Sequence, residues 1–133
     1  MAEDKQSVEA ELAALNEACE KLIRSIADAR SVREVVSLED VEVPNHLRAI
    51  AYARVPSLGR IRRVRDNRVE EIVQHQLHTL RIERNEIVAS REFDRIKAGD
   101  WYILRTDYPE LYVKALREAN LIFQNKQRQR ERR

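Results

Sequence analysis

The amino-acid sequence predicts an all-α protein of three to five helices, in antiparallel hairpins with a long central helix and coiled-coil-like packing. The 133 residues include only two glycines and three prolines, so few positions interrupt a helix. Apolar residues also recur at intervals of three and four over most of the chain, which places them on one side of a helix. We expect a single helical domain over residues 1–125, followed by a basic, disordered tail at 126–133.

The first helix is expected over residues 4–30. Its apolar residues are separated alternately by four and three positions, which is a heptad pattern. Polar residues occupy most of the positions between them, as on the solvent side of a helix. So narrow an apolar seam must pack against another helix, either in the same chain or in a second copy. We interpret it as an interaction seam, whose central residues are Leu12, Leu15, Cys19, Leu22 and Ile26.

Residues 31–43 are expected to form short helical turns and then an extended segment, because the residue before Pro44 is excluded from the helical region. Pro44 suits the first turn of a second helix over residues 45–55. Pro56 ends this helix, and the glycine-containing segment 57–59 is expected to form a turn.

Residues 60–98 contain neither glycine nor proline, and they are expected to form the long central helix. Its one local weakness is the pair Asp66 and Asn67. The remaining pattern predicts a short helix near 100–106 and a longer one over 108–125, with apolar residues again three and four apart.

The composition predicts a cytoplasmic protein that does not interact with membranes. The single cysteine cannot form an internal disulfide, which fits a reducing compartment. No stretch of about 18 apolar residues is present, as a membrane-spanning helix would need. The first residues are acidic and lack the apolar core of a secretory signal.

Seven arginines lie within 21 residues, against one acidic residue, Asp66. Arginine at this density suits contacts with phosphates. A helix, a turn and an arginine-rich helix over residues 45–68 are also the components of a helix-turn-helix. These features predict, as an alternative function, a protein that binds DNA or RNA, for example as a regulator. The seven residues are Arg48, Arg54, Arg60, Arg62, Arg63, Arg65 and Arg68.

The same cluster has a second possible partner within the chain. Residues 1–43 carry five basic and eleven acidic side chains, a net charge of −6, whereas residues 44–99 carry a net charge of +5. The arginines could therefore pair with the acidic first helix instead of a phosphate backbone. Asparagine, glutamine and serine, which often read bases, are nearly absent from the arginine-rich helix before Asn67.

Two short segments, residues 53–65 and 109–112, are similar to sequences of small terminase subunits of tailed phages. Those subunits combine a helix-turn-helix with long oligomerising helices, so the similarity implies an oligomer that binds DNA, and a protein of the phage-packaging type as a form of the alternative function. It covers a small part of the chain and includes no specific motif, and no family is assigned from it.

The sequence offers no set of residues suited to catalysis, and neither glycine lies in a phosphate-binding loop. Cys19 lies on the apolar seam, where a thiol is buried and unreactive. Glu71, His75 and His78 could share one helical face, but their spacing departs from the common zinc motifs. We therefore predict no enzymatic activity, no catalytic residues, no bound metal and no cofactor.

The predicted function is that of a non-catalytic helical interaction protein, which oligomerises or serves as a subunit or adaptor of a larger assembly. The apolar seams and the central helix, which has apolar residues on two sides, provide more apolar surface than one thin bundle can bury within itself. The predicted partner is a second copy or another helical protein. In the alternative function, the partner is DNA or RNA, bound through the basic cluster at 48–68.

Overall fold

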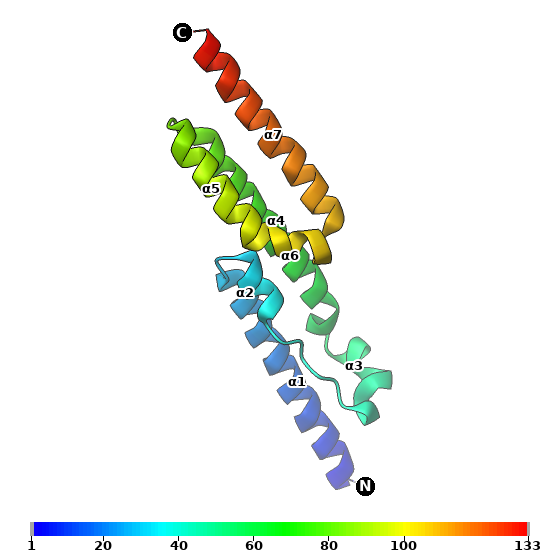
Figure 1. Cartoon of the computed structure of the whole chain (residues 1–133). Coiled ribbons are helices and arrows are strands. Elements are labelled where there is room, and N and C mark those ends of the chain that lie inside the picture. The colour runs from blue at the N-terminus through cyan, green and yellow to red at the C-terminus, as the bar shows by residue number, and fades with distance from the viewer. Residues whose placement is uncertain (1, 133) are drawn as a thin grey trace. The chain divides into compact units, whose positions relative to one another are not determined.

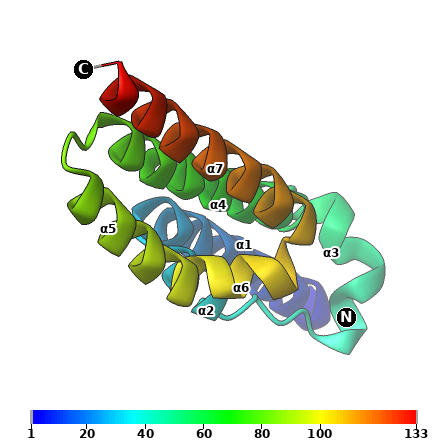
Figure 2. The same ribbon diagram turned by 45° about the horizontal axis from the view of Figure 1, so that its top comes forward.

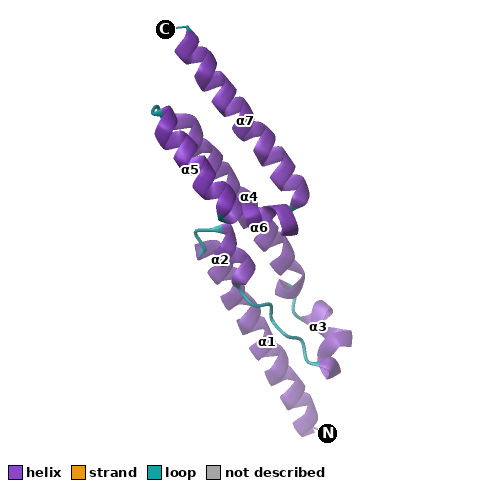
Figure 3. Cartoon of the chain, viewed as in Figure 1, coloured by secondary structure: helices purple, strands orange, loops and turns teal. Residues whose placement is uncertain are grey.

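The computed structural model describes the backbone of residues 2–132 and the side chains of residues 7–132, and every regular element there is a helix (Figure 3). The predicted all-α fold class is confirmed. The predicted count of three to five helices is wrong, because the described residues form seven α-helices and one short 3-10 helix. Coiled-coil-like packing stays a prediction. In chain order the elements are α1 (Ala2–Asp28), α2 (Val32–Ser37), η1 (Asn45–Leu47), α3 (Arg48–Arg54), α4 (Ser57–Ile82), α5 (Glu86–Ala98), α6 (Asp100–Asp107) and α7 (Pro109–Glu131).

The chain divides into two compact units, whereas the sequence predicted one domain over residues 1–125. The first unit comprises Met1–Ala29 and Glu34–Arg68, and the second comprises Arg30–Arg33 and Val69–Arg133. Helices α2 and α4, which are labelled in Figure 1, each contribute residues to both units.

In the first unit, α3 is a short helix that ends before Pro56. The 3-10 helix η1 directly precedes it, and Pro44, the residue before η1, has the backbone angles φ −56° and ψ 142°, which are outside the helical region. The turn between α3 and α4 consists only of Val55 and Pro56, because α4 begins at Ser57. Gly59 therefore lies inside α4 and not in the turn that the sequence predicted. A Cβ atom at this position would meet no atom within 4 Å, so the local packing does not require glycine.

The predicted central helix over residues 60–98 is interrupted, and α4 and α5 form a hairpin instead. The break lies between Ile82 and Glu86, whereas Asp66 and Asn67 lie within α4. Asn85 determines where α5 begins, because its side-chain oxygen accepts hydrogen bonds from the backbone amides of Ile87 (3.0 Å) and Val88 (3.2 Å). Such an N-cap satisfies two of the amides that a helix start leaves unpaired.

The core of the second unit includes an aromatic cluster, through which α5, α6 and α7 meet. The Phe93 ring lies 5.6 Å from the Trp101 ring in an edge-to-face arrangement and 5.3 Å from the Phe123 ring. Trp101 is fully buried, and its indole Nε1 donates a hydrogen bond to the side-chain oxygen of Gln76 at 2.9 Å. Helix α6 joins α5 to α7, which runs in the direction opposite to α5 (Figure 2).

A partly buried polar junction in the second unit is centred on Asp100, the first residue of α6. Its carboxylate accepts hydrogen bonds from Gln76 Nε2 (2.8 Å) and from the backbone amides of Val32 (3.1 Å) and Arg33 (3.3 Å). These amides open α2, so Asp100 caps a helix that is distant in sequence.

Helix α7 continues past residue 125 to Glu131, into the segment 126–133 that the sequence predicted to be a disordered tail. Lys126 donates to the backbone carbonyls of Arg81 (3.1 Å) and Glu83, which lie at the end of α4. Arg130 forms an ion pair with Glu86 at 3.1 Å. These contacts bind the last turns of α7 to the α4–α5 hairpin, although residues 126–133 include no apolar side chain.

Candidate functional site

The predicted interaction seam lies inside the chain. All five of its residues are buried, and Cys19 and Ile26 have no exposed surface. The chain therefore covers the seam without a second copy, and an association surface made of exposed side chains must lie elsewhere. The other three seam residues, Leu12, Leu15 and Leu22, are between 5% and 8% exposed.

The buried thiol of Cys19 does not suit nucleophilic chemistry. Burial raises the pKa of Cys19 above its usual value, and the nearby negative charge of Glu20 raises it further. Because the thiolate is the reactive species, both effects lower the reactivity of this residue. Cys19 is therefore a core residue of α1.

Polar contacts join the acidic α1 to the segment that leads into α4. Arg54 of α3 pairs with Glu9 at 2.6 Å, and His46 of η1 lies 2.7 Å from a carboxylate oxygen of Glu11. Arg54 is thus one arginine of the predicted cluster that pairs with the first helix. Both pairs are largely exposed, so each contributes at most about 1 kcal/mol to stability.

Arg65 is also bound within the first unit, and its side chain is only 14% exposed. Its guanidinium donates to the backbone carbonyls of Val35 (2.7 Å) and Leu38 (2.8 Å) and to the Asp40 carboxylate (2.8 Å). This one side chain holds the segment that connects α2 to the extended residues before η1. It is not available to a phosphate.

Arg68 closes the C-terminal end of α1. Its Nε and Nη2 atoms donate to the backbone carbonyl of Ala29, at 3.0 and 2.7 Å. A cation at the end of a helix is favourable, since the free carbonyls there carry partial negative charge. Three of the seven predicted nucleic-acid-binding arginines, Arg54, Arg65 and Arg68, therefore contact the protein itself.

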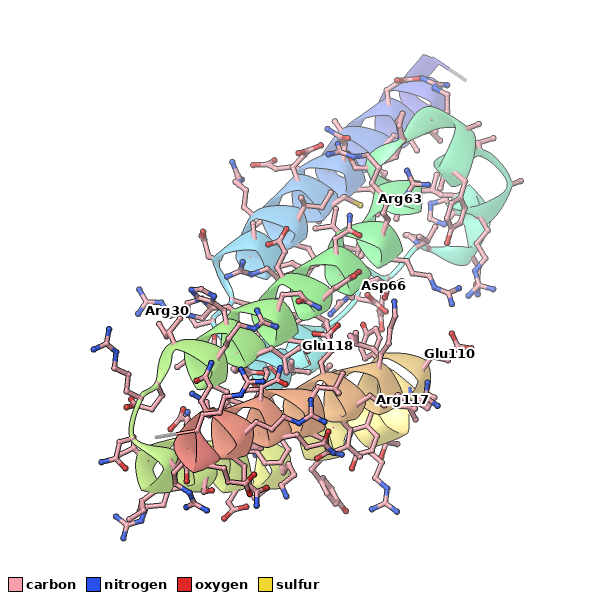
Figure 4. All side chains as sticks on the ribbon, turned by 90° about the horizontal axis from the view of Figure 1, so that it is seen from above. Arg30, Arg63, Asp66, Glu110, Arg117 and Glu118 are labelled. Atoms are coloured by element: carbon pink, nitrogen blue, oxygen red, sulfur yellow. The ribbon has the colours of Figure 1, made fainter. Side chains whose placement is uncertain are left out.

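The other four arginines of the cluster are exposed, and their side chains have no hydrogen bond or ion pair with any residue that the structure describes. Three of them lie in the first two turns of α4, where the first turn contains no acidic side chain. Figure 4 shows Arg63 and the acidic Asp66 projecting from this helix. The sequence of the first unit carries ten basic and twelve acidic residues, so the cluster belongs to a unit of net charge −2. The four are Arg48, Arg60, Arg62 and Arg63.

A surface groove in the first unit was not predicted from the sequence. It has a volume of about 760 Å³ and lies between the extended segment before η1 and one side of α3. Tyr52 of α3 is 65% exposed in this groove. The available signal was the Val-Glu-Val-Pro sequence, which we interpreted only as a connection. The lining residues are Val41, Glu42, Val43, Pro44, Asn45, Arg48 and Tyr52.

Helix α7 has an outer side in addition to its buried one. Val113 and Leu121 are 47% and 56% exposed, although both are large and apolar. Charged residues accompany them on this helix, and Figure 4 shows Glu110 and Arg117 projecting from it. A shallow cavity of about 400 Å³ follows the same helix, lined by Pro109, Glu110, Val113, Lys114 and Arg117.

The described residues contain no group of three or more histidine, cysteine, aspartate or glutamate side chains placed to hold a metal ion. His75 and His78 are both exposed on α4. Among the helices described, none combines the length and apolarity that crossing a bilayer requires. Comparison with models of protein families, with curated proteins and with solved structures gives no match for this chain.

Proposed function

We propose that this chain is a non-catalytic helical interaction protein, which forms oligomers or serves as a subunit or adaptor of a larger assembly. The observation that supports this function is the two-sided character of α7. One side is buried through Ala115, Ala119 and Ile122, and the other presents Val113 and Leu121 to solvent.

The outer apolar residues of α7 belong to one continuous stripe. Pro109, Val113, Arg117 and Leu121 are four positions apart, so each lies about 40° around the helix from the last. Val113 and Leu121 are already about half covered, so completing the burial of each contributes about 1 kcal/mol, which favours a partner that packs along this stripe. Arginine beside apolar residues is a common composition at the centre of protein interfaces.

Changing both Val113 and Leu121 to aspartate is expected to lower the assembled mass, or the binding of a helical partner, without lowering the unfolding temperature. Both positions are exposed in the single chain, so the carboxylates remain hydrated there and are buried only in an interface. Light scattering at several protein concentrations measures the mass, and circular dichroism measures the unfolding.

The control changes Gln74 and Ser90 to aspartate, since these exposed positions on α4 and α5 receive the same two charges. If the α7 variant and the control have the same assembled mass at every concentration, and if both still bind the same partner, α7 is not the association surface.

A second candidate function is nucleic-acid binding by the free arginines of α3 and α4. The observation that favours it is the absence of any partner for Arg48, Arg60, Arg62 and Arg63 among the described residues. Positive side chains near the start of a helix repel its positive dipole end, and a bound phosphate relieves that repulsion. The net charge of −2 on the first unit places this function second.

If these arginines contact phosphates, changing Arg60, Arg62 and Arg63 to glutamine should weaken duplex DNA binding and flatten its salt dependence by roughly one unit of log–log slope per lost contact. Fluorescence anisotropy at several salt concentrations measures both quantities. The control changes Arg81, Arg84 and Arg91, which are exposed in the second unit. Equal losses in both variants would show a non-specific charge effect, and no DNA binding by the wild type at low salt would exclude the function.

A further inference from the structure

The extended segment beside the groove resembles an unpaired edge of a β-sheet. Val41 and Val43 are partly buried, whereas Glu42 between them is exposed, which is the alternation of a strand with one face packed. Among the described residues, no backbone amide or carbonyl of these three residues takes part in a hydrogen bond. Such a segment offers donors and acceptors that another extended chain can satisfy.

The opposite wall of the groove supplies two side chains suited to recognition. Arg48 and Tyr52 are four positions apart on α3 and therefore lie on the same side of the helix. Both are exposed, and neither has a hydrogen-bonding partner among the described residues. Arginine and tyrosine are enriched among the residues that contribute most to binding. The groove volume of about 760 Å³ falls within the range of ligand-binding clefts.

We propose that this groove binds an extended, acidic peptide segment of a partner protein. The segment pairs its backbone with residues 41–43, places a carboxylate on Arg48 and packs an apolar side chain against Tyr52. Backbone pairing supplies affinity in this mode of recognition, and the side-chain contacts supply specificity. This inference rests on the proposed function as an interaction protein. The groove is a separate binding surface from the outer side of α7, and its partner is an extended acidic peptide.

The groove suits a peptide better than a nucleic acid. A phosphate backbone has no amide donors to pair with the carbonyls of residues 41–43, which line the groove. Arg48 is the single cationic residue of the lining, whereas nucleic-acid grooves present rows of them. A carboxylate, by contrast, is satisfied by one guanidinium through two parallel hydrogen bonds.

Contacts within the first unit hold the groove open before a peptide arrives. Arg65 binds the carbonyls of Val35 and Leu38, just before the extended segment. Beyond that segment, the backbone amide of Leu47 donates to the carbonyl of Pro44 at 2.9 Å. Fixing the segment at both ends reduces the conformational entropy that binding would otherwise cost.

The test uses the full chain and short fluorescein-labelled peptides of alternating threonine and valine, with a glutamate, glutamine or lysine at the central position. We expect the glutamate peptide to bind best in fluorescence anisotropy, and a central proline to abolish its binding because proline lacks an amide donor. On binding, the amides of residues 41–43 should become protected from hydrogen exchange.

Arg48→Gln is expected to weaken binding of the glutamate peptide about tenfold or more, because it removes the charged partner of the carboxylate. Tyr52→Ala should weaken binding of all the peptides. The matched controls are Arg63→Gln and Tyr102→Ala, which change exposed residues outside the groove and should have no effect.

The proposal is overturned if none of the peptides binds, or if the controls weaken binding as much as Arg48→Gln and Tyr52→Ala. It is also overturned if an oligonucleotide protects residues 41–43 and displaces the peptide. Assembly through α7 is measured separately by light scattering. If the chain assembles normally but binds no peptide, the proposal for the groove is wrong and the proposed function as an interaction protein is unaffected.

Discussion

Changing Leu15 and Leu22 together to aspartate is expected to unfold the chain, with loss of its helical circular dichroism at room temperature. Both side chains are nearly covered, with 6% and 8% of their surface exposed. Each change removes about 2 kcal/mol or more of apolar burial and places a carboxylate at a position that is almost fully shielded from water. Together these losses approach or exceed the stability of a typical domain, which is about 5–15 kcal/mol.

The matched control is the double change of Ala14 and Ala18 to aspartate. Both alanines are exposed on α1, so this variant receives the same two charges on the same helix. It should remain folded, because the new carboxylates stay in water. If the leucine variant melts at the same temperature as this control, the seam is not the core of α1 and its burial would have to be reconsidered.

The seam could be predicted from sequence because its signal is local and periodic. A heptad of Leu12, Leu15, Cys19, Leu22 and Ile26 requires only that the segment is helical and that something covers one side. Every one of these residues is buried. The all-α fold class rests on the same kind of signal, together with the scarcity of glycine and proline.

The helix breaks were harder to predict, because they depend on competition between local and tertiary contacts. Residues 83–85 contain neither glycine nor proline, yet the chain turns there. Asn85 caps the following helix, and Lys126 binds the carbonyls at the end of the preceding one. Only the first of these contacts has a local sequence signal. The second joins residues more than forty positions apart.

The arginine cluster shows why the density of charge in a sequence does not define a binding site. Arg54, Arg65 and Arg68 are indistinguishable in sequence from their neighbours, but each reaches a partner on another segment of the first unit. The groove beside Tyr52 was missed for a different reason. The Val-Glu-Val-Pro sequence indicated only an extended segment, and the groove exists only because α3 lies beside that segment.

Arg65→Met is expected to destabilise the chain by about 2–4 kcal/mol, because three hydrogen bonds to a charged donor are lost and two carbonyls lose their partner. Methionine keeps most of the length of the side chain, so the loss of packing is small. The matched control, Arg63→Met, removes an exposed arginine from the same helix and should change stability by less than about 0.5 kcal/mol.

Urea titrations measure the difference between the two variants, and hydrogen exchange shows where it arises. In Arg65→Met, the amides of residues 35–43 should exchange faster than in the wild type, since Arg65 binds the carbonyls of Val35 and Leu38 and the carboxylate of Asp40. Arg65→Lys should be intermediate, because an ammonium group reaches fewer of the three acceptors. Equal urea midpoints for Arg65→Met and Arg63→Met would mean that Arg65 is a surface arginine, available to a phosphate after all.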